Sequence, residues 1–239
     1  MTGALGEFLG TMILILLGDG VVAGVLLKRS KGENAGWLAI TAGWAFAVVC
    51  GVFTAAAFGA PGHLNPAVTA GALAIGATSA NEAWSLIGAQ LAGAFVGAIL
   101  VWIHYLPHWA ETPEPDFKLG IFCTIPAIRQ PLGNFISEVI GTFVLVFVAE
   151  ALVNAKAATG MTPYLIGILV WGIGLSLGGT TGYAINPARD LGPRIAHFLL
   201  PIPGKRDSDW GYSWVPVLGP LVGGVIAARA FALLGQVMQ

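Results

Sequence analysis

Charged residues are scarce in this sequence of 239 amino acids: Asp, Glu, Lys and Arg make up 10% of the chain, against 56% hydrophobic residues. With 11 basic and 12 acidic side chains the formal net charge is −1, so the sequence offers no basic surface for nucleic acid. The mean hydropathy of +0.80 is far above that of soluble domains. The composition therefore predicts a polytopic membrane protein in a lipid bilayer, without a nucleic-acid partner.

Cysteine is almost missing as well. Cys50 and Cys123 are far apart and lack metal-ligand spacing, so we expect no disulfide framework, no metal site and no cofactor. A basic leader is also missing before the first apolar run, and Glu7 lies inside that run. We therefore expect this run to be a retained membrane span and not a cleaved signal peptide.

The sequence is instead rich in long apolar segments. Six of them predict membrane-spanning helices, at about 4–27, 36–58, 83–106, 133–153, 163–181 and 213–234. The Pro- and acid-rich segment 107–131 is the longest connection, and we expect it to run over the surface. The chain is thus predicted to be one transmembrane domain over 1–239.

Two copies of Asn-Pro-Ala, at Asn65 and Asn186, each predict the start of a helix. Asn is favoured just before a helix, and Pro suits its first position. The apolar run after Asn65 is about half the length that a membrane span needs. The run after Asn186 contains Arg189 and Asp190, which cannot face lipid. Both copies therefore predict half-helices that enter the membrane without crossing it.

The two halves of the chain, 1–115 and 130–239, are repeats. Glu7 and Glu138 each begin the pattern Glu-x-x-Gly-Thr in the first span of their half, and Gly93 and Gly97 match Gly219 and Gly223. Because each half has three crossings, the second copy lies inverted. The expected architecture is all-α, with six transmembrane helices and two re-entrant half-helices that meet near the middle of the bilayer. Such a matched pair of short segments indicates a substrate path.

The half-helix starts suggest the chemistry of that path. Two helix N-termini concentrate positive dipole ends, which repel cations. The Asn65 and Asn186 side chains can cap their helices and offer N–H donors to a passing hydroxyl. Backbone carbonyls ahead of each Asn are expected to form an acceptor ladder, because unpaired backbone at this depth occurs where it lines a water-filled path; these residues are Gly62, His63, Leu64, Ala184 and Ile185.

Together, the two Asn-Pro-Ala boxes, the repeated Glu-x-x-Gly-Thr and the run Asn186-Pro187-Ala188-Arg189-Asp190 resemble the major intrinsic protein family of water and glycerol channels. Within it, the sequence is similar to the aquaglyceroporin (glycerol facilitator) branch over its whole length. The resemblance implies the aquaporin fold and a passive channel for glycerol, water and other small neutral solutes that excludes ions and protons. It also implies a homotetramer in the plasma membrane, with cytoplasmic termini and no enzymatic activity.

The resemblance also assigns residues to an outer selectivity filter. It places Arg189 beside Trp44 and Tyr183, and it places Gly174 where water-selective members carry His. Tyr183 stands where glycerol facilitators carry Phe. Structural support is expected from the buried acids: Glu7 and Glu138 would accept hydrogen bonds from loop N–H groups, and Asp190 would hold the loop or Arg194. Asp19 has no counterpart in the second half.

Three alternatives remain at this point. A water-selective aquaporin is disfavoured by Trp44, Gly174 and Asp190. A secondary transporter would need a titrating acid or a cation site on the path. An intramembrane enzyme would need a Ser/His/Asp set or a metal cluster, and the sequence supports neither.

The distribution of basic residues disagrees with the orientation that the resemblance implies. Taken alone, the positive-inside rule would place the loops after spans one, three and five in the cytoplasm. These loops carry Lys28, Arg29, Lys31, Lys118, Arg129, Lys205 and Arg206, while the other side has Lys156 and Arg229. We follow the resemblance, because the charge bias is a tendency.

Overall fold

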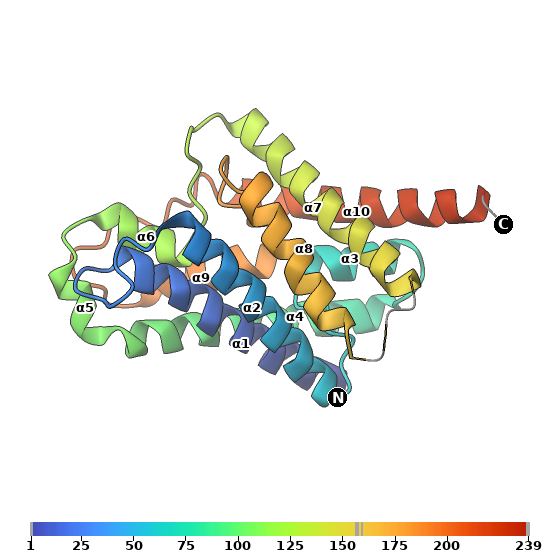
Figure 1. The fold of residues 1–239 in the computed structure, drawn as a ribbon, viewed down its shortest axis with the longest axis horizontal. Helices are drawn as coiled ribbons and strands as arrows, with labels where there is room; N and C mark the ends of the chain where they lie inside the picture. Colours follow the sequence, from blue (N-terminus) through green and yellow to red (C-terminus); the bar gives the residue numbers. More distant parts are fainter. Residues whose placement is uncertain (1, 156–157, 159, 238–239) are drawn as a thin grey trace.

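The computed structural model describes residues 2–155, 158 and 160–237, and the regular elements in this part of the chain are all α-helices. Lys156 lies outside the described residues. The helices are α1 (Thr2–Leu26), α2 (Gly36–Ala57), α3 (Pro66–Ala74), α4 (Ala80–His104), α5 (Leu106–Glu111), α6 (Pro115–Phe122), α7 (Pro131–Asn154), α8 (Thr162–Ser176), α9 (Pro187–Leu199) and α10 (Trp214–Val237). They form one bundle, with the C-terminal end of α10 toward the right and α5 and α6 toward the left (Figure 1).

The predicted membrane spans correspond to the long helices. Five helices of the described chain, α1, α2, α4, α7 and α10, are long and apolar enough to cross a bilayer, and α8 is an apolar helix of 15 residues. The prediction for the fifth span, 163–181, was wrong at its C-terminal end, because α8 stops at Ser176. Glycines 178 and 179 disfavour helix there, and the chain continues as turns into the second Asn-Pro-Ala box.

The connection between the halves also differs from its prediction. Segment 107–131 was expected to be a surface linker, but it includes part of α5 and all of α6. Trp109 and Phe122 are fully buried and stack with ring centroids 5.7 Å apart. α6 packs against α1 and α9. The segment is anchored because its apolar side chains cover the end of the bundle.

The half-helices α3 and α9 each begin with an Asn cap. Asn65 Oδ1 accepts a hydrogen bond from the backbone N–H of Ala67 at 2.8 Å, and Asn186 Oδ1 accepts one from Ala188 at 3.0 Å. α3 packs mainly on α10, and α9 packs mainly on α4. Each half-helix is therefore supported chiefly by the last long helix of the other half.

Glycine allows the long helices of each half to approach closely. A Cβ on Gly93 of α4 would lie 2.2 Å from the carbonyl oxygen of Phe8 on α1, and one on Gly223 of α10 would lie 2.4 Å from that of Val139 on α7. Such distances leave no room for a side chain. The same contact thus closes the α1–α4 pair and the α7–α10 pair, as expected for small residues between membrane helices.

Candidate functional site

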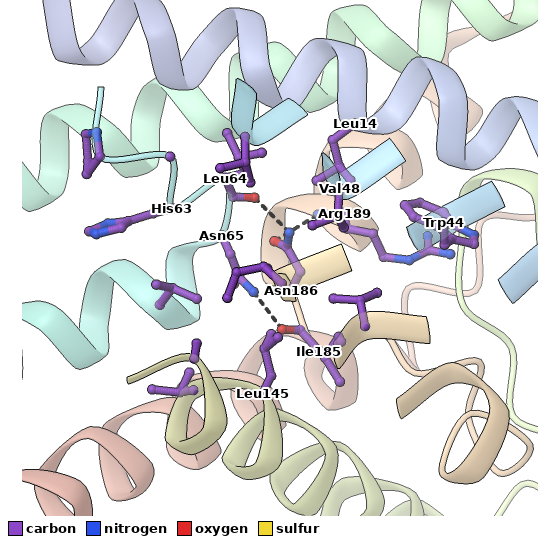
Figure 2. A pocket seen from close by; sticks show the side chains of 18 of the residues that line it. Leu14, Trp44, Val48, His63, Leu64, Asn65, Leu145, Ile185, Asn186 and Arg189 are labelled. Carbon is purple, nitrogen blue, oxygen red and sulfur yellow. Dashed lines mark hydrogen bonds between the residues drawn. The ribbon is translucent and has the colours of Figure 1, made fainter. Parts of the chain in front are cut away.

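The two box asparagines meet where the half-helices face each other. Asn65 Nδ2 donates a hydrogen bond to the carbonyl oxygen of Ile185 at 2.8 Å, and Asn186 Nδ2 donates one to the carbonyl oxygen of Leu64 at 2.7 Å (Figure 2). Each amide carries two N–H groups. One is used in the contact with the opposite loop, which leaves the other for a molecule in the space beside them.

Two buried carboxylates hold the loops that precede the asparagines. Glu7 accepts hydrogen bonds from the backbone N–H groups of His63 at 2.7 Å and Leu64 at 2.6 Å. Glu138 does the same for Ala184 at 3.0 Å and Ile185 at 2.8 Å. These four backbone N–H groups therefore have hydrogen-bond acceptors, although the loops are not helical.

The loop backbone is held in an unusual conformation. Leu64, Tyr183 and Ile185 have φ angles of 51°, 38° and 44°, in the left-handed region that is rare for residues with a side chain and most unfavourable for a β-branched one. In the described chain, the carbonyls of Gly62, His63 and Ala184 accept no hydrogen bond. The strain is compensated by the carboxylates, and acceptors are left for a ligand.

A cavity of about 270 Å³ runs between the loops and the long helices. The loops line it through Gly62, His63, Leu64, Tyr183, Ala184 and Ile185. The helices line it with side chains spaced mainly four residues apart: Trp44, Val48 and Val52 on α2, Leu145, Ala149 and Val153 on α7, and Thr162, Ile166 and Val170 on α8. One wall is therefore mostly apolar and the other carries backbone acceptors and the two Asn amides.

An aromatic and cationic cluster lies at one end of this cavity. The guanidinium carbon of Arg189 lies 4.1 Å from the ring centroid of Trp44, within cation–π range. Tyr183 also lines this end, and all three side chains are at most 7% exposed. Figure 2 shows the Arg189 side chain directed toward Trp44. Apolar ring faces and N–H donors therefore border the same space.

Gly174 lies behind this cluster and does not line the cavity. A Cβ at Gly174 would lie 2.9 Å from Cζ and the hydroxyl oxygen of Tyr183. Trp37 closes the same side, because its indole N–H donates to the Gly174 carbonyl at 3.1 Å and its ring meets that of Tyr183 edge-on at 5.8 Å. The missing side chain of Gly174 thus makes room for the Tyr183 ring.

Asp190 anchors the second half-helix to the connection between the halves. Its carboxylate lies 2.7 Å from Arg194 Nε and accepts hydrogen bonds from Thr124 N and Oγ1 at 2.8 and 2.7 Å. Arg194 also donates to the carbonyls of Ser208 at 2.6 Å and Asp209 at 3.1 Å. Both Asp190 and Arg194 are fully buried, so one ion pair fixes two loops around α9.

The sequence reasoning gave no role to Asp19, which the structure places beside the cluster. Asp19 is fully buried on α1, and its Oδ1 lies 3.7 Å from Arg189 Nη1. An acid inside an apolar span was the available signal. Trp37 and the spaced apolar residues on α2, α7 and α8 were also missed, because nothing in the sequence orients those helices.

The family can be decided from this architecture together with a comparison of sequences. The sequence model of the family described as Major intrinsic protein matches residues 1–231. The chain belongs to the major intrinsic protein family. Its six spans α1, α2, α4, α7, α8 and α10 and its half-helices α3 and α9 form the aquaporin fold that the sequence predicted.

Similar members of the major intrinsic protein family include named transport proteins. Glycerol uptake facilitator protein 3 of Lactiplantibacillus plantarum is 59% identical over 234 residues, which cover 96% of this chain and 95% of the relative. The probable glycerol uptake facilitator protein of Thermotoga maritima is 56% identical over 231 residues, 97% of this chain and 98% of the relative. Among solved structures, the aquaglyceroporin from Plasmodium falciparum matches with a TM-score of 0.86 and 31% identity, over 96% of this chain and 94% of that chain.

Proposed function

We propose that this major intrinsic protein is a passive channel for glycerol, water and other small neutral solutes, and that it excludes ions and protons and catalyses no reaction. The observation that carries the proposal is the pair of Asn amides facing a cavity with one apolar wall and one wall of carbonyl acceptors. A polyol has CH groups on one side and hydroxyl groups on the other, so it matches both walls at once.

The site residues take distinct roles in this channel. Asn65 and Asn186 donate their free N–H groups to the oxygen of the permeant, and the loop carbonyls accept its hydroxyl hydrogens. Trp44, Tyr183 and Arg189 form the selectivity filter, with CH groups against the rings and hydroxyls toward the guanidinium. Glu7, Glu138 and Asp190 do not touch the permeant and hold the loops in place.

Exclusion of ions follows from the charges along the path. The N-termini of α3 and α9 and the Arg189 guanidinium place positive potential where a cation or hydronium would pass. A water molecule bound to the two amides must donate outward in both directions, which interrupts a proton wire. Glu150 and His63 also line the cavity, but the proposed channel has no step in which either side chain binds or releases a proton, so solute flux is expected to be linear in its gradient.

A water-selective channel is the second candidate, and one observation favours it. The Tyr183 side chain lines the cavity, and its hydroxyl oxygen has no hydrogen-bond partner within the described chain that would hold the ring back against Gly174. If the ring moves into the cavity, the narrower filter passes water faster than glycerol.

Stopped-flow light scattering on proteoliposomes distinguishes the two candidates. After a hyperosmotic glycerol step, a glycerol channel gives rapid shrinkage followed by accelerated re-swelling, and sucrose gives shrinkage alone. Fast shrinkage without accelerated re-swelling would identify a water channel. Saturation of the glycerol flux or its coupling to an ion gradient would contradict a channel and indicate a transporter.

Two substitutions on α2 provide a matched pair for this assay. Val48 lines the cavity, whereas Phe46, two residues earlier, is 63% exposed on the outside of the bundle. V48W is expected to abolish accelerated glycerol flux because the indole fills the path, and F46W is expected to retain it. Equal flux through both variants would argue that solutes do not use this cavity.

We further propose a homotetramer in the plasma membrane with one pore per subunit and cytoplasmic termini. The family resemblance supports both parts. Cross-linking in native membranes tests the assembly, and a band series that ends at the dimer would contradict it. Protease cleavage of a C-terminal tag in inside-out but not right-side-out vesicles tests the orientation, and the reverse pattern would agree with the positive-inside rule.

A further inference from the structure

Asp19 is a buried acid that the proposed function leaves without a role. It is fully buried on α1, and neither of its carboxylate oxygens has a hydrogen-bond partner within the described residues. Arg189 Nη1, 3.7 Å from Asp19 Oδ1, is also without one in the same part of the chain. A buried charge is expensive unless an opposite charge is near. The two groups therefore depend on each other.

The neighbouring charges divide into two separate pairs. Asp190 follows Arg189 directly in the sequence, but its carboxylate is taken by Arg194 Nε at 2.7 Å and Nη2 at 2.9 Å. Asp19 is thus left as the carboxylate that faces Arg189. The filter guanidinium is balanced from α1, a helix that the family resemblance did not connect with the filter.

The residue before Asp19 contacts the other side of the same cluster. A Cβ at Gly18 would lie 2.3 Å from Cζ3 of Trp44, so the indole ring packs directly on the α1 backbone. Arg189 in turn stacks on that ring at 4.1 Å. Of two consecutive α1 residues, Gly18 therefore sets the position of the Trp44 ring, and Asp19 faces the Arg189 guanidinium that stacks on this ring.

We propose that Asp19 is a positioning residue for the filter, which holds the Arg189 guanidinium against Trp44 and balances its charge. With the Asp19 carboxylate in place, the Arg189 guanidinium keeps a fixed orientation, in which its free N–H donors point into the cavity. Without it, the unpaired guanidinium turns toward the loop carbonyls and obstructs the slot. A polyol, which must fit between ring and guanidinium, is affected more than water. This role rests on the proposed channel function, because Asp19 acts on the filter of that channel.

A double-mutant cycle tests this role. Glycerol and water permeabilities are measured for the wild type, D19N, R189L and D19N/R189L, with T11V as a control. Thr11 is buried on α1 about two turns before Asp19. D19N is expected to lower the glycerol-to-water permeability ratio about twofold to tenfold, the range for losing one hydrogen-bond-sized interaction. The same substitution in the R189L background, and T11V, are expected to leave the ratio unchanged.

Thermal unfolding of the same variants gives an independent readout. R189L leaves Asp19 buried without a cation, so it is expected to melt below the wild type, and D19N/R189L is expected to recover part of that loss. An unchanged ratio in D19N, or an equal effect of D19N with and without Arg189, would overturn the proposal. If D19N alone does not fold, recovery in the double variant supports the pairing and its absence overturns it. If the wild type passes no glycerol, the proposed substrate fails, while the melting cycle still decides the role of Asp19.

Discussion

Asn65 donates its side-chain hydrogen bond to the carbonyl of Ile185, a residue 120 positions later, at a distance of 2.8 Å. Asn186 in turn donates a side-chain hydrogen bond to the carbonyl oxygen of Leu64 at 2.7 Å. Each asparagine therefore caps its own half-helix and joins it to the loop of the other half. The centre of the channel is formed by both halves of the chain, and neither half contains a complete site.

Replacing Asn65 with Ala removes the cap and the bond to Ile185 together. Loss of a cap alone costs about 0.5–2 kcal/mol. We therefore expect N65A to melt several degrees lower in detergent and to conduct glycerol more slowly. Asn154 provides the control, because its amide donates within its own helix to the Glu150 carbonyl at the exposed end of α7. If N65A and N154A had the same melting temperature, the contact between the halves would carry little stability.

Asp190→Asn is expected to be among the most destabilising single changes in the chain. It leaves Arg194 buried without its carboxylate, and breaking a buried pair in this way costs about 3–5 kcal/mol. Asp207, which pairs with Arg206 at 3.2 Å on the surface, serves as the control. Its substitution D207N is expected to change stability by less than about 0.5 kcal/mol. Urea or thermal unfolding of the purified variants measures both, and similar losses would contradict the anchoring role of Asp190.

Gly93→Ala is expected to prevent close packing of α1 and α4. The new Cβ would lie 2.2 Å from the Phe8 carbonyl, and that backbone cannot move without displacing the helix. We expect poor expression or an aggregated peak in size-exclusion chromatography. Apart from its chain neighbours and the backbone of its own helix, a Cβ at Gly172 in α8 would meet no heavy atom of the described residues within 4 Å, so G172A should behave as the wild type. A monodisperse, fully active G93A protein would show that the helices can separate without loss.

Gly174→Ala tests whether the space behind Tyr183 controls the filter. The added Cβ would lie 2.9 Å from the phenol and push the ring into the cavity. Glycerol permeability should fall more than water permeability. In a Y183L background the shorter side chain no longer meets that Cβ, so G174A should then have little further effect. An equal effect of G174A in both backgrounds would show that the ring position is not responsible.

The sequence alone predicted the fold because its signals are local. Each signal can be read within one segment of the chain: apolar runs of about 20 residues indicate membrane spans, and an Asn-Pro pair indicates the start of a short helix. The same signals then recur in the same order in both halves of the sequence. The end of α8 was misplaced because the predicted span was continued through Gly178 and Gly179 to Thr181, although these glycines disfavour helix and α8 ends at Ser176. The buried anchoring of segment 107–131 was missed because Trp109 and Phe122 contact each other only after folding.

The residues of the site were also largely named from the sequence, and most line one cavity. Gly174 is different, since it acts from behind Tyr183. Asp19 and Trp37 could not be assigned, because their partners are far away in the sequence. Trp37 and Gly174, for example, are 137 positions apart. A helix taken alone does not show which neighbouring helix or loop its side chains will contact. The positive φ angles of Leu64 and Ile185 follow from carboxylates on other helices, so the local sequence does not specify them.

The reciprocal asparagine contacts also have a consequence for biosynthesis. When the ribosome has translated Asn65, the acceptor Ile185 is still 120 codons away, and α10, on which α3 packs, comes later still. The first half-helix is therefore synthesised before its partners exist. Its contacts with Ile185 and α10 can form only after those later parts of the chain have been made, so assembly of the pore has to follow their synthesis.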